Sequence, residues 1–135
     1  LTEIWQVEEA TGRSGEPLHV YADVVVALDG ATEPGAARLR RLDDIAGEPY
    51  TSDTTVFTGT AADLAGLVAA WHELGCNGVR LRPLALPDDL DRIVADLVPE
   101  LQRRGLFRTA YQASTLRGLL GLPTDVPNQY AAHVV

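Results

Sequence analysis

The stretch TVFTGTAADLAGLVAAWHELGCNGVRLRP, residues 55–83, decides the fold. It contains two short apolar segments, near 55–58 and 78–82, which are separated by a helical pattern that opens at Thr60. Thr60 is a good N-cap residue, and Asp63 follows three positions later as an aspartate version of the capping box. A strand, a long crossover helix and a second strand predict a parallel βαβ unit.

A strand and a helix are also expected before this unit. Residues 18–28, LHVYADVVVAL, form a continuous valine-rich run that is typical of a strand buried on both faces. After the Asp29-Gly30 turn, the spacing of apolar residues predicts an amphipathic helix over 33–45. Its buried face should carry Ala36, Leu39, Leu42 and Ile45 or Ala46, and its polar face most of Arg38, Arg40, Arg41, Asp43 and Asp44.

Two further helices complete the pattern. Residues 1–10 have helical spacing, and a longer helix is expected over 88–104, where Pro99 lacks an amide hydrogen and should kink or split the helix near Val98. Its expected buried stripe is Leu90, Ile93, Val94, Leu97, Val98 and Leu101. The alternating order of helices and strands predicts the α/β class, but periodicity alone leaves both a doubly wound sheet and a slice of a barrel open.

Length and composition limit the possible functions. With 135 residues the chain should form a single domain over 1–135, whereas a complete (β/α) barrel needs roughly 250 residues. The net charge of −8 and the absence of a basic stripe argue against nucleic-acid binding. No window is apolar enough for a membrane span, and no His or Cys spacing suits a metal. The lone Cys76, interpreted as structural, favours a cytoplasmic setting.

Two short groups of residues could carry binding chemistry. Thr58-Gly59-Thr60 lies between a strand end and a helix start, where free amides favour an anion, although a simple N-cap explains the same residues. Arg80 and Arg82 alternate with apolar neighbours, so both should project to the same side of their strand. If that side is the inside of a barrel, these two arginines need carboxylate or ligand partners.

Three blocks of the chain carry a family resemblance. They are FTGTAADLAGL at residues 57–67, GVRLRP at 78–83 and LVPELQRRGLFRTAYQASTLRGLLGL at 97–122. Together they resemble the C-terminal portion of the luciferase-like, flavin-dependent monooxygenases, in the subgroup that includes the nitrilotriacetate and dibenzothiophene-sulfone monooxygenases. The resemblance extends over residues 16–130, but these correspond to only about the last third of such an enzyme.

The resemblance implies a fold and a cofactor. The fold would be a partial (β/α) barrel with about three parallel strands and covering helices, which correspond to the last third of a TIM barrel. Residues 16–105 would form the βα units and 106–135 a C-terminal extension. Relatives use reduced FMN, delivered by a separate reductase, to activate oxygen and to insert one oxygen atom into a small organic substrate.

The resemblance also implies where the site lies. The flavin would lie across the carboxyl ends of the strands. The expected cofactor-binding residues are Thr58, Gly59, Thr60 and Arg82, and the expected substrate-pocket residues are Asp29 and Pro83. The catalytic residues stay unknown, because in relatives they come from earlier strands that this chain lacks.

Assembly is a further expectation, since a partial barrel has two exposed strand edges. We expect a homo-oligomer whose interface buries the neighbours of Val24, Val26, Val56 or Val79, or a missing N-terminal barrel half as the partner. The tail that contains Phe107, Tyr111 and Tyr130 would wrap a partner or fold back over its own sheet. The alternative function is a non-catalytic half-barrel that binds an anion or a flavin, or that only assembles.

Overall fold

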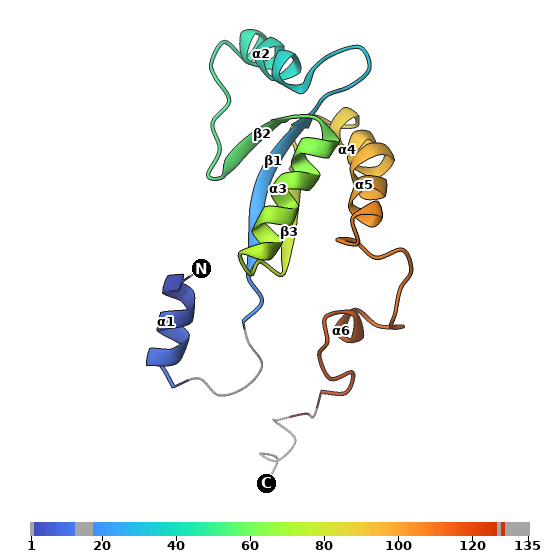
Figure 1. Ribbon diagram of the computed structural model, residues 1–135. Coiled ribbons are helices and arrows are strands. Elements are labelled where there is room, and N and C mark those ends of the chain that lie inside the picture. The colour runs from blue at the N-terminus through green and yellow to red at the C-terminus, as the bar shows by residue number, and fades with distance from the viewer. Residues whose placement is uncertain (1, 13–17, 127, 129–135) are drawn as a thin grey trace.

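One sheet of three parallel strands forms the centre of the chain in the computed structural model, which describes residues 2–12, 18–126 and 128. The strands are β1 (Tyr21–Leu28), β2 (Thr55–Gly59) and β3 (Gly78–Pro83). The three predicted strands and their parallel direction are therefore confirmed. Helices flank this open sheet (Figure 1), so the α/β class is also confirmed. The parallel direction of the strands and the flanking helices match part of a β/α barrel, whereas the order of the strands differs from that of a complete barrel.

The order of the strands is β2-β1-β3, with β1 in the middle. Val25 of β1 is paired with Val56 of β2 on one side and with Arg82 of β3 on the other. In a complete barrel each strand lies beside the next one along the chain, which would place β2 in the middle. Here β1 lies between β2 and β3, so the connection from β2 to β3, which contains α3 (Ala61–Glu73), crosses over β1. Alternating helices and strands are compatible with either order.

The hydrophobic core lies between β1 and the helices on one face of the sheet. Side chains alternate along a strand, so Val24, Val26 and Leu28 point to this face, and all three are fully buried. Val25 and Ala27 point to the opposite face and are buried as well, so both faces of β1 are buried, as its continuous apolar run predicted. The core cluster consists of Val24, Val26, Leu28, Leu64, Ala65, Val68, Ile93, Leu97 and Leu101.

The long helix predicted over 88–104 is divided into three parts. These are α4 (Asp88–Arg92), the π-helical turn η1 (Ile93–Leu97) and α5 (Val98–Arg103). The break near Val98 is confirmed: Pro99 cannot donate a backbone hydrogen bond, and a wide π turn precedes it. The predicted buried stripe is only partly correct, because Leu90 is 46% and Val94 is 62% exposed.

Helix α2 (Gly35–Ala46) lies beyond the carboxyl ends of the strands rather than on a face of the sheet (Figure 1). Its first residue must be glycine, because a Cβ atom on Gly35 would lie 1.8 Å from the carbonyl oxygen of Ala27. The predicted faces of this helix are wrong at two positions. Arg38, expected on the polar face, is buried, and Ile45, expected on the buried face, is 73% exposed.

The two ends of the described chain are peripheral. Helices α1 (Thr2–Ala10) and α6 (Leu116–Leu119) contain no buried residue, and Figure 1 shows both beyond the amino end of the sheet rather than over its core. Phe107 and Tyr111 are exposed, and Tyr130 lies outside the described residues. No helix in the described ranges has the length and apolar character that a membrane span needs.

Candidate functional site

Three of the predicted site residues lie at the carboxyl edge of the sheet, one at the end of each strand. The backbone amide of Asp29 donates to the carbonyl of Gly59 over 2.8 Å, which joins the ends of these two strands. On the other side, the amide of Leu84, directly after Pro83, donates to the carbonyl of Val26 over 2.9 Å. The structure therefore brings Asp29, Gly59 and Pro83 to one edge, because parallel strands end at the same side of their sheet.

The start of α3 confirms the N-cap interpretation of Thr60. Its side-chain oxygen accepts a hydrogen bond from the amide of Asp63 over 3.1 Å. Its hydroxyl lies 2.6 Å from Oδ2 of Asp63, to which it donates. The carboxylate of Asp63 thus lies at the positive end of the helix dipole, where an anionic ligand would otherwise be favoured. Gly59, before the cap, has a φ of 147°.

The side chain of Asp29 forms a hydrogen bond with the backbone of the loop that follows it. Its Oδ1 accepts a hydrogen bond of 2.8 Å from the amide of Gly35, the first residue of α2. This bond holds the loop between β1 and α2 against the strand end. The carboxylate of Asp29 therefore stabilises the backbone at the carboxyl edge of the sheet.

Arg80 and Arg82 project to the same side of β3, as predicted, and both contact Asp23 of β1. Nε of Arg80 donates to Oδ1 of Asp23 over 2.9 Å. Nη1 of Arg82 lies 3.4 Å from Asp23 and 2.6 Å from Oδ1 of Asp53. These atoms lie on the face of the sheet opposite the helix-covered core, and the charge of Arg82 is balanced by two carboxylates.

The arginines alter the acidity of their partners. Hydrogen bonding from Arg80, assisted by Arg82, holds the pKa of Asp23 below its ordinary value. The hydrogen bond from Arg82 likewise lowers the pKa of Asp53. Both carboxylates are therefore ionised near neutral pH, and Arg82 does not present a free positive charge to a ligand.

A buried ion pair at the carboxyl edge was missed by the sequence analysis. Nη2 of Arg38 lies 2.5 Å from Oδ1 of Asp89 and 2.6 Å from the carbonyl oxygen of Leu28. Asp89 is fully buried and also accepts hydrogen bonds from the amides of Leu28 and Ala85. The pair therefore ties α2, β1 and the start of α4 together.

The sequence did contain a signal for Asp89. The buried positions of the long helix recur every four residues, at Asp89, Ile93, Leu97 and Leu101. An aspartate in line with three buried aliphatic residues on one helix face needs partners in the interior. A favourable interaction with the helix dipole would explain an exposed aspartate at the start of this helix, but not a fully buried one.

The described residues do not by themselves fit the phosphate of FMN. Asp63 places a carboxylate at the start of α3, and Arg82 is paired with Asp23 and Asp53 on the open face. A phosphate beside Asp63 would experience like-charge repulsion. Phosphate binding at this edge therefore requires groups from outside this chain or a displacement of Asp63.

Comparison with known proteins identifies monooxygenases over about half of the chain, although no family model matches it. The chain is 39% identical over 77 residues to N-acetyl-S-(2-succino)cysteine monooxygenase of Bacillus subtilis (strain 168), a match that covers 56% of this chain. It is 45% identical over 65 residues to nitrilotriacetate monooxygenase component A of Aminobacter aminovorans, covering 47% of this chain. Dibenzothiophene-sulfone monooxygenase of Rhodococcus erythropolis is 42% identical over 67 residues, or 49% of this chain.

These matches cover only a small part of each relative. The chain spans 17%, 14% and 15% of the length of the three proteins, respectively. The similarity is therefore to one segment of such a protein, not to a whole one. Over that segment, this chain is a homologue of curated monooxygenases.

Proposed function

We propose that this chain is the C-terminal part of a reduced-FMN-dependent, luciferase-like monooxygenase that oxidises a small organic substrate with molecular oxygen. The observation that carries the proposal is the 39–45% identity to curated monooxygenases. The parallel strands that end at one edge, with Asp29, Gly59 and Pro83 together there, support it. Ligands of open α/β sheets bind at the carboxyl ends of the strands.

The contribution of this chain to such a site is positional. Asp29 fixes the start of α2, Thr60 and Asp63 fix the start of α3, and Asp89 fixes the loop before α4. Three loops are thereby held in a constant arrangement, which is what a preorganised binding site needs. The groups that contact the isoalloxazine ring and the phosphate, and the catalytic residues, would come from the remaining strands of the barrel.

The outer surface of the chain supports a need for those remaining strands. In the described sheet, β2 and β3 each pair on one side only. Leu86, Leu90 and Val94 follow one another at four-residue intervals and are 71%, 46% and 62% exposed, respectively. We propose that the polypeptide that carries the rest of the barrel covers these residues and the free strand edges, and that a separate reductase supplies the reduced flavin.

The interface expected around these strands stays a proposal, and burial within the chain limits which residues could contribute to it. Val24 and Val26 are fully buried under α3 and η1 of the same chain, so neither is available to a partner. They are covered because valines of a central strand pack first against the helices that their own crossovers provide. The exposed Leu86, Leu90 and Val94 replace them as the proposed contact surface.

A segment exchange tests the function. The matching segment of nitrilotriacetate monooxygenase component A is replaced by the 65 aligned residues of this chain, and FMN binding and nitrilotriacetate-dependent oxygen consumption are measured with reduced FMN supplied. We expect the chimera to bind FMN and to retain activity. A chimera of native thermal stability that binds no FMN would contradict the proposal. The matched control carries a flexible Gly/Ser linker in place of the segment.

The second candidate is a non-catalytic unit that only assembles, which the carboxylate of Asp63 at the start of α3 favours. Titration of the isolated chain with FMN, followed by flavin fluorescence, tests whether the chain alone binds the flavin, and sedimentation equilibrium over a wide concentration range tests whether it assembles. We expect no tight FMN binding by the isolated chain and self-association through its exposed edges. A constant mass of 14.5 kDa would contradict the expected self-association.

A further inference from the structure

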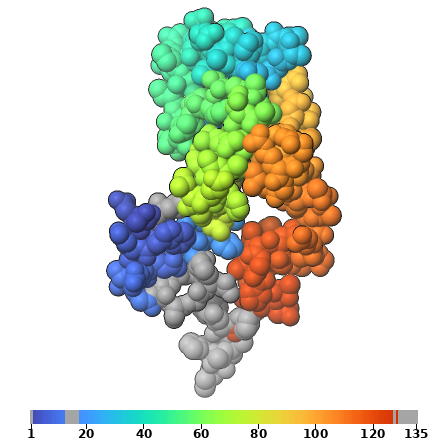
Figure 2. All heavy atoms as spheres, in the orientation of Figure 1, coloured from blue at the N-terminus to red at the C-terminus, as the bar shows by residue number. Residues whose placement is uncertain are grey.

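A cavity of about 610 Å³ lies on the helix-covered face of the sheet, at the amino ends of the strands. It is bounded by the second half of α3, by η1 and α5, and by the segment that begins at Gly105. In Figure 2 the surface is hollowed between the end of α3 and residues 105–120. Cavities that hold small molecules have volumes of about 300–1,000 Å³, so this one has a suitable size.

The walls of the cavity are predominantly apolar. Trp71 of α3, Leu81 of β3 and Leu97, Leu101 and Leu106 from the long helix and its end supply aliphatic and aromatic surface. Such walls favour a ligand with an apolar body, because burying apolar surface is favourable in proportion to its area. The position is distinct from the proposed monooxygenase site, since Asp29, Gly59 and Pro83 lie at the opposite ends of the strands.

One guanidinium group also lines this cavity. Arg108 stacks on the rings of Phe107 and Tyr111, with its Cζ atom 4.6 Å and 4.7 Å from the two ring centroids. Among the described residues, no carboxylate forms an ion pair with Arg108. The nearby Arg103 and Arg104 differ, because Glu100 pairs with both.

The guanidinium of Arg108, which stacks on two rings and forms no ion pair with a described carboxylate, is suited to bind an anionic group of a ligand. The two rings restrict the side chain, so a further hydrogen bond to a carboxylate requires little additional ordering. The chain as a whole has a net charge of −8, which repels anions at long range. At physiological ionic strength charges more than about 8 Å apart are largely screened, so the direct contact with Arg108 decides the preference.

We propose that this cavity binds a small apolar carboxylate, with the apolar body between α3 and α5 and the carboxylate at Arg108. A neutral amphiphile of the same size would fill the same apolar space without using the guanidinium. An organic cation would meet the positive charge of Arg108 at the mouth. The proposal concerns a second ligand site and does not depend on the function proposed for the carboxyl edge.

Tryptophan fluorescence reports on occupancy, because Trp71 lines the cavity and the chain contains only one other tryptophan, Trp5. In a Trp5→Phe background, decanoate and decan-1-ol are titrated as monomers at near-physiological ionic strength. We expect saturable changes with both, and roughly fivefold tighter binding of decanoate, the range expected for one exposed charge-assisted contact. Equal affinities, or no saturable change, would overturn the proposal.

Two variants locate the contacts. Arg108→Gln should weaken decanoate to the affinity of decan-1-ol and leave decan-1-ol unchanged. The matched control is Arg117→Gln, whose guanidinium donates to the carbonyl of Pro123 away from the cavity and should alter neither ligand. Val98→Phe reduces the space beside α5 and should weaken both ligands.

Circular dichroism and sedimentation accompany each titration. If Arg108→Gln keeps the preference for decanoate, or if folded Val98→Phe binds both ligands unchanged, binding takes place elsewhere and the proposal fails. If the native chain is a dimer that binds neither ligand, a second copy occupies the cavity, which also overturns the proposal.

Discussion

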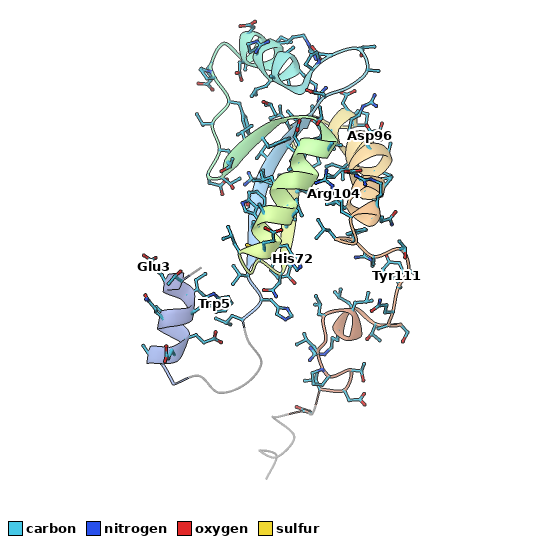
Figure 3. The ribbon with its side chains drawn as sticks, in the orientation of Figure 1. Glu3, Trp5, His72, Asp96, Arg104 and Tyr111 are labelled. Carbon is cyan, nitrogen blue, oxygen red and sulfur yellow. The ribbon has the colours of Figure 1, made fainter. Side chains whose placement is uncertain are left out.

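The carboxyl edge of the sheet and the opposite, amino end are built in different ways. At the carboxyl edge, charged and polar side chains bind backbone groups: Asp89 accepts from Leu28 and Ala85, and Asp29 accepts from Gly35. At the amino end, apolar side chains surround a cavity of about 610 Å³. In Figure 3 the labelled Tyr111 lies on the chain after α5, away from the sheet and across from His72 at the end of α3.

This difference indicates different capacities in the two regions. Directed hydrogen bonds to buried groups hold loops in one arrangement, which suits a site where reactants must be positioned. Apolar contacts are not directional, and a cavity between helices can accept a ligand without a loss of hydrogen bonds. We therefore expect substitutions at the carboxyl edge to lower stability more than chemically matched substitutions near the cavity.

The largest effect is expected at the buried ion pair. Asp89→Ala leaves Arg38 as an uncompensated buried charge and leaves the amides of Leu28 and Ala85 unpaired. We expect the free energy of unfolding to fall by about 3–5 kcal/mol, measured by urea denaturation. Asp91→Ala removes an exposed carboxylate from the same helix and should change it by less than about 0.5 kcal/mol. Similar losses in the two variants would contradict the role assigned to Asp89.

A pair of leucines compares core packing in the two regions. Leu64 is fully buried at the start of α3, whereas Leu101 is 6% exposed and lines the cavity. Leu64→Ala should lower the free energy of unfolding by about 3 kcal/mol or more. Leu101→Ala should cost less, because part of its surface already faces empty space. A larger loss for Leu101→Ala would show that the cavity region is the better packed one.

Two threonine caps have the same chemistry in the two regions. Thr60 caps α3, and Thr115 caps α6 by accepting from the amide of Gly118 over 3.1 Å. Thr60→Ala should lower the free energy of unfolding by about 1 kcal/mol, because α3 supplies core residues. Thr115→Ala should have no measurable effect on the main urea transition, because α6 contains no buried residue. An equal shift for both would show that α6 unfolds together with the core.

The smallest effect concerns an ionic contact between the regions. Hydrogen bonds from Arg103 and Arg104 lower the pKa of Glu100 to about 2 from its ordinary 4.5, and Arg104 also donates to the carbonyl of Ala62 in α3. Because the folded-state pKa is the lower one, this stabilisation is present above about pH 4.5 and is lost as the pH falls towards 2.

Urea midpoints test this pH dependence. The difference between the native chain and Glu100→Gln should be visible at about pH 6 and should shrink at about pH 3. Arg103→Gln leaves Arg104 as a partner of Glu100 and should give a smaller difference. A difference that does not change with pH would show that the carboxylate of Glu100 contributes nothing through its charge.

Features that depend on neighbouring residues were predictable from the sequence. The valine-rich run before Asp29 predicted a strand, and Thr60 with Asp63 predicted a helix start, because both signals are local. The position of the break near Pro99 followed from its missing amide hydrogen. Recognisable blocks of sequence also indicated the monooxygenase relatives, which the comparisons confirm over about half of the chain.

Features that depend on distant residues required the tertiary structure. The amide of Leu28 and the carboxylate of Asp89 are 61 positions apart, so no local pattern shows that they meet. The middle place of β1, the pairing of Arg82 with Asp53 and the cavity beside Trp71 arise in the same way. The sequence alone determined which segments become strands and helices, since their periodicity and caps act within a few residues. Only tertiary packing decided which charges are neutralised and which space stays open, because these depend on contacts between segments far apart in the chain.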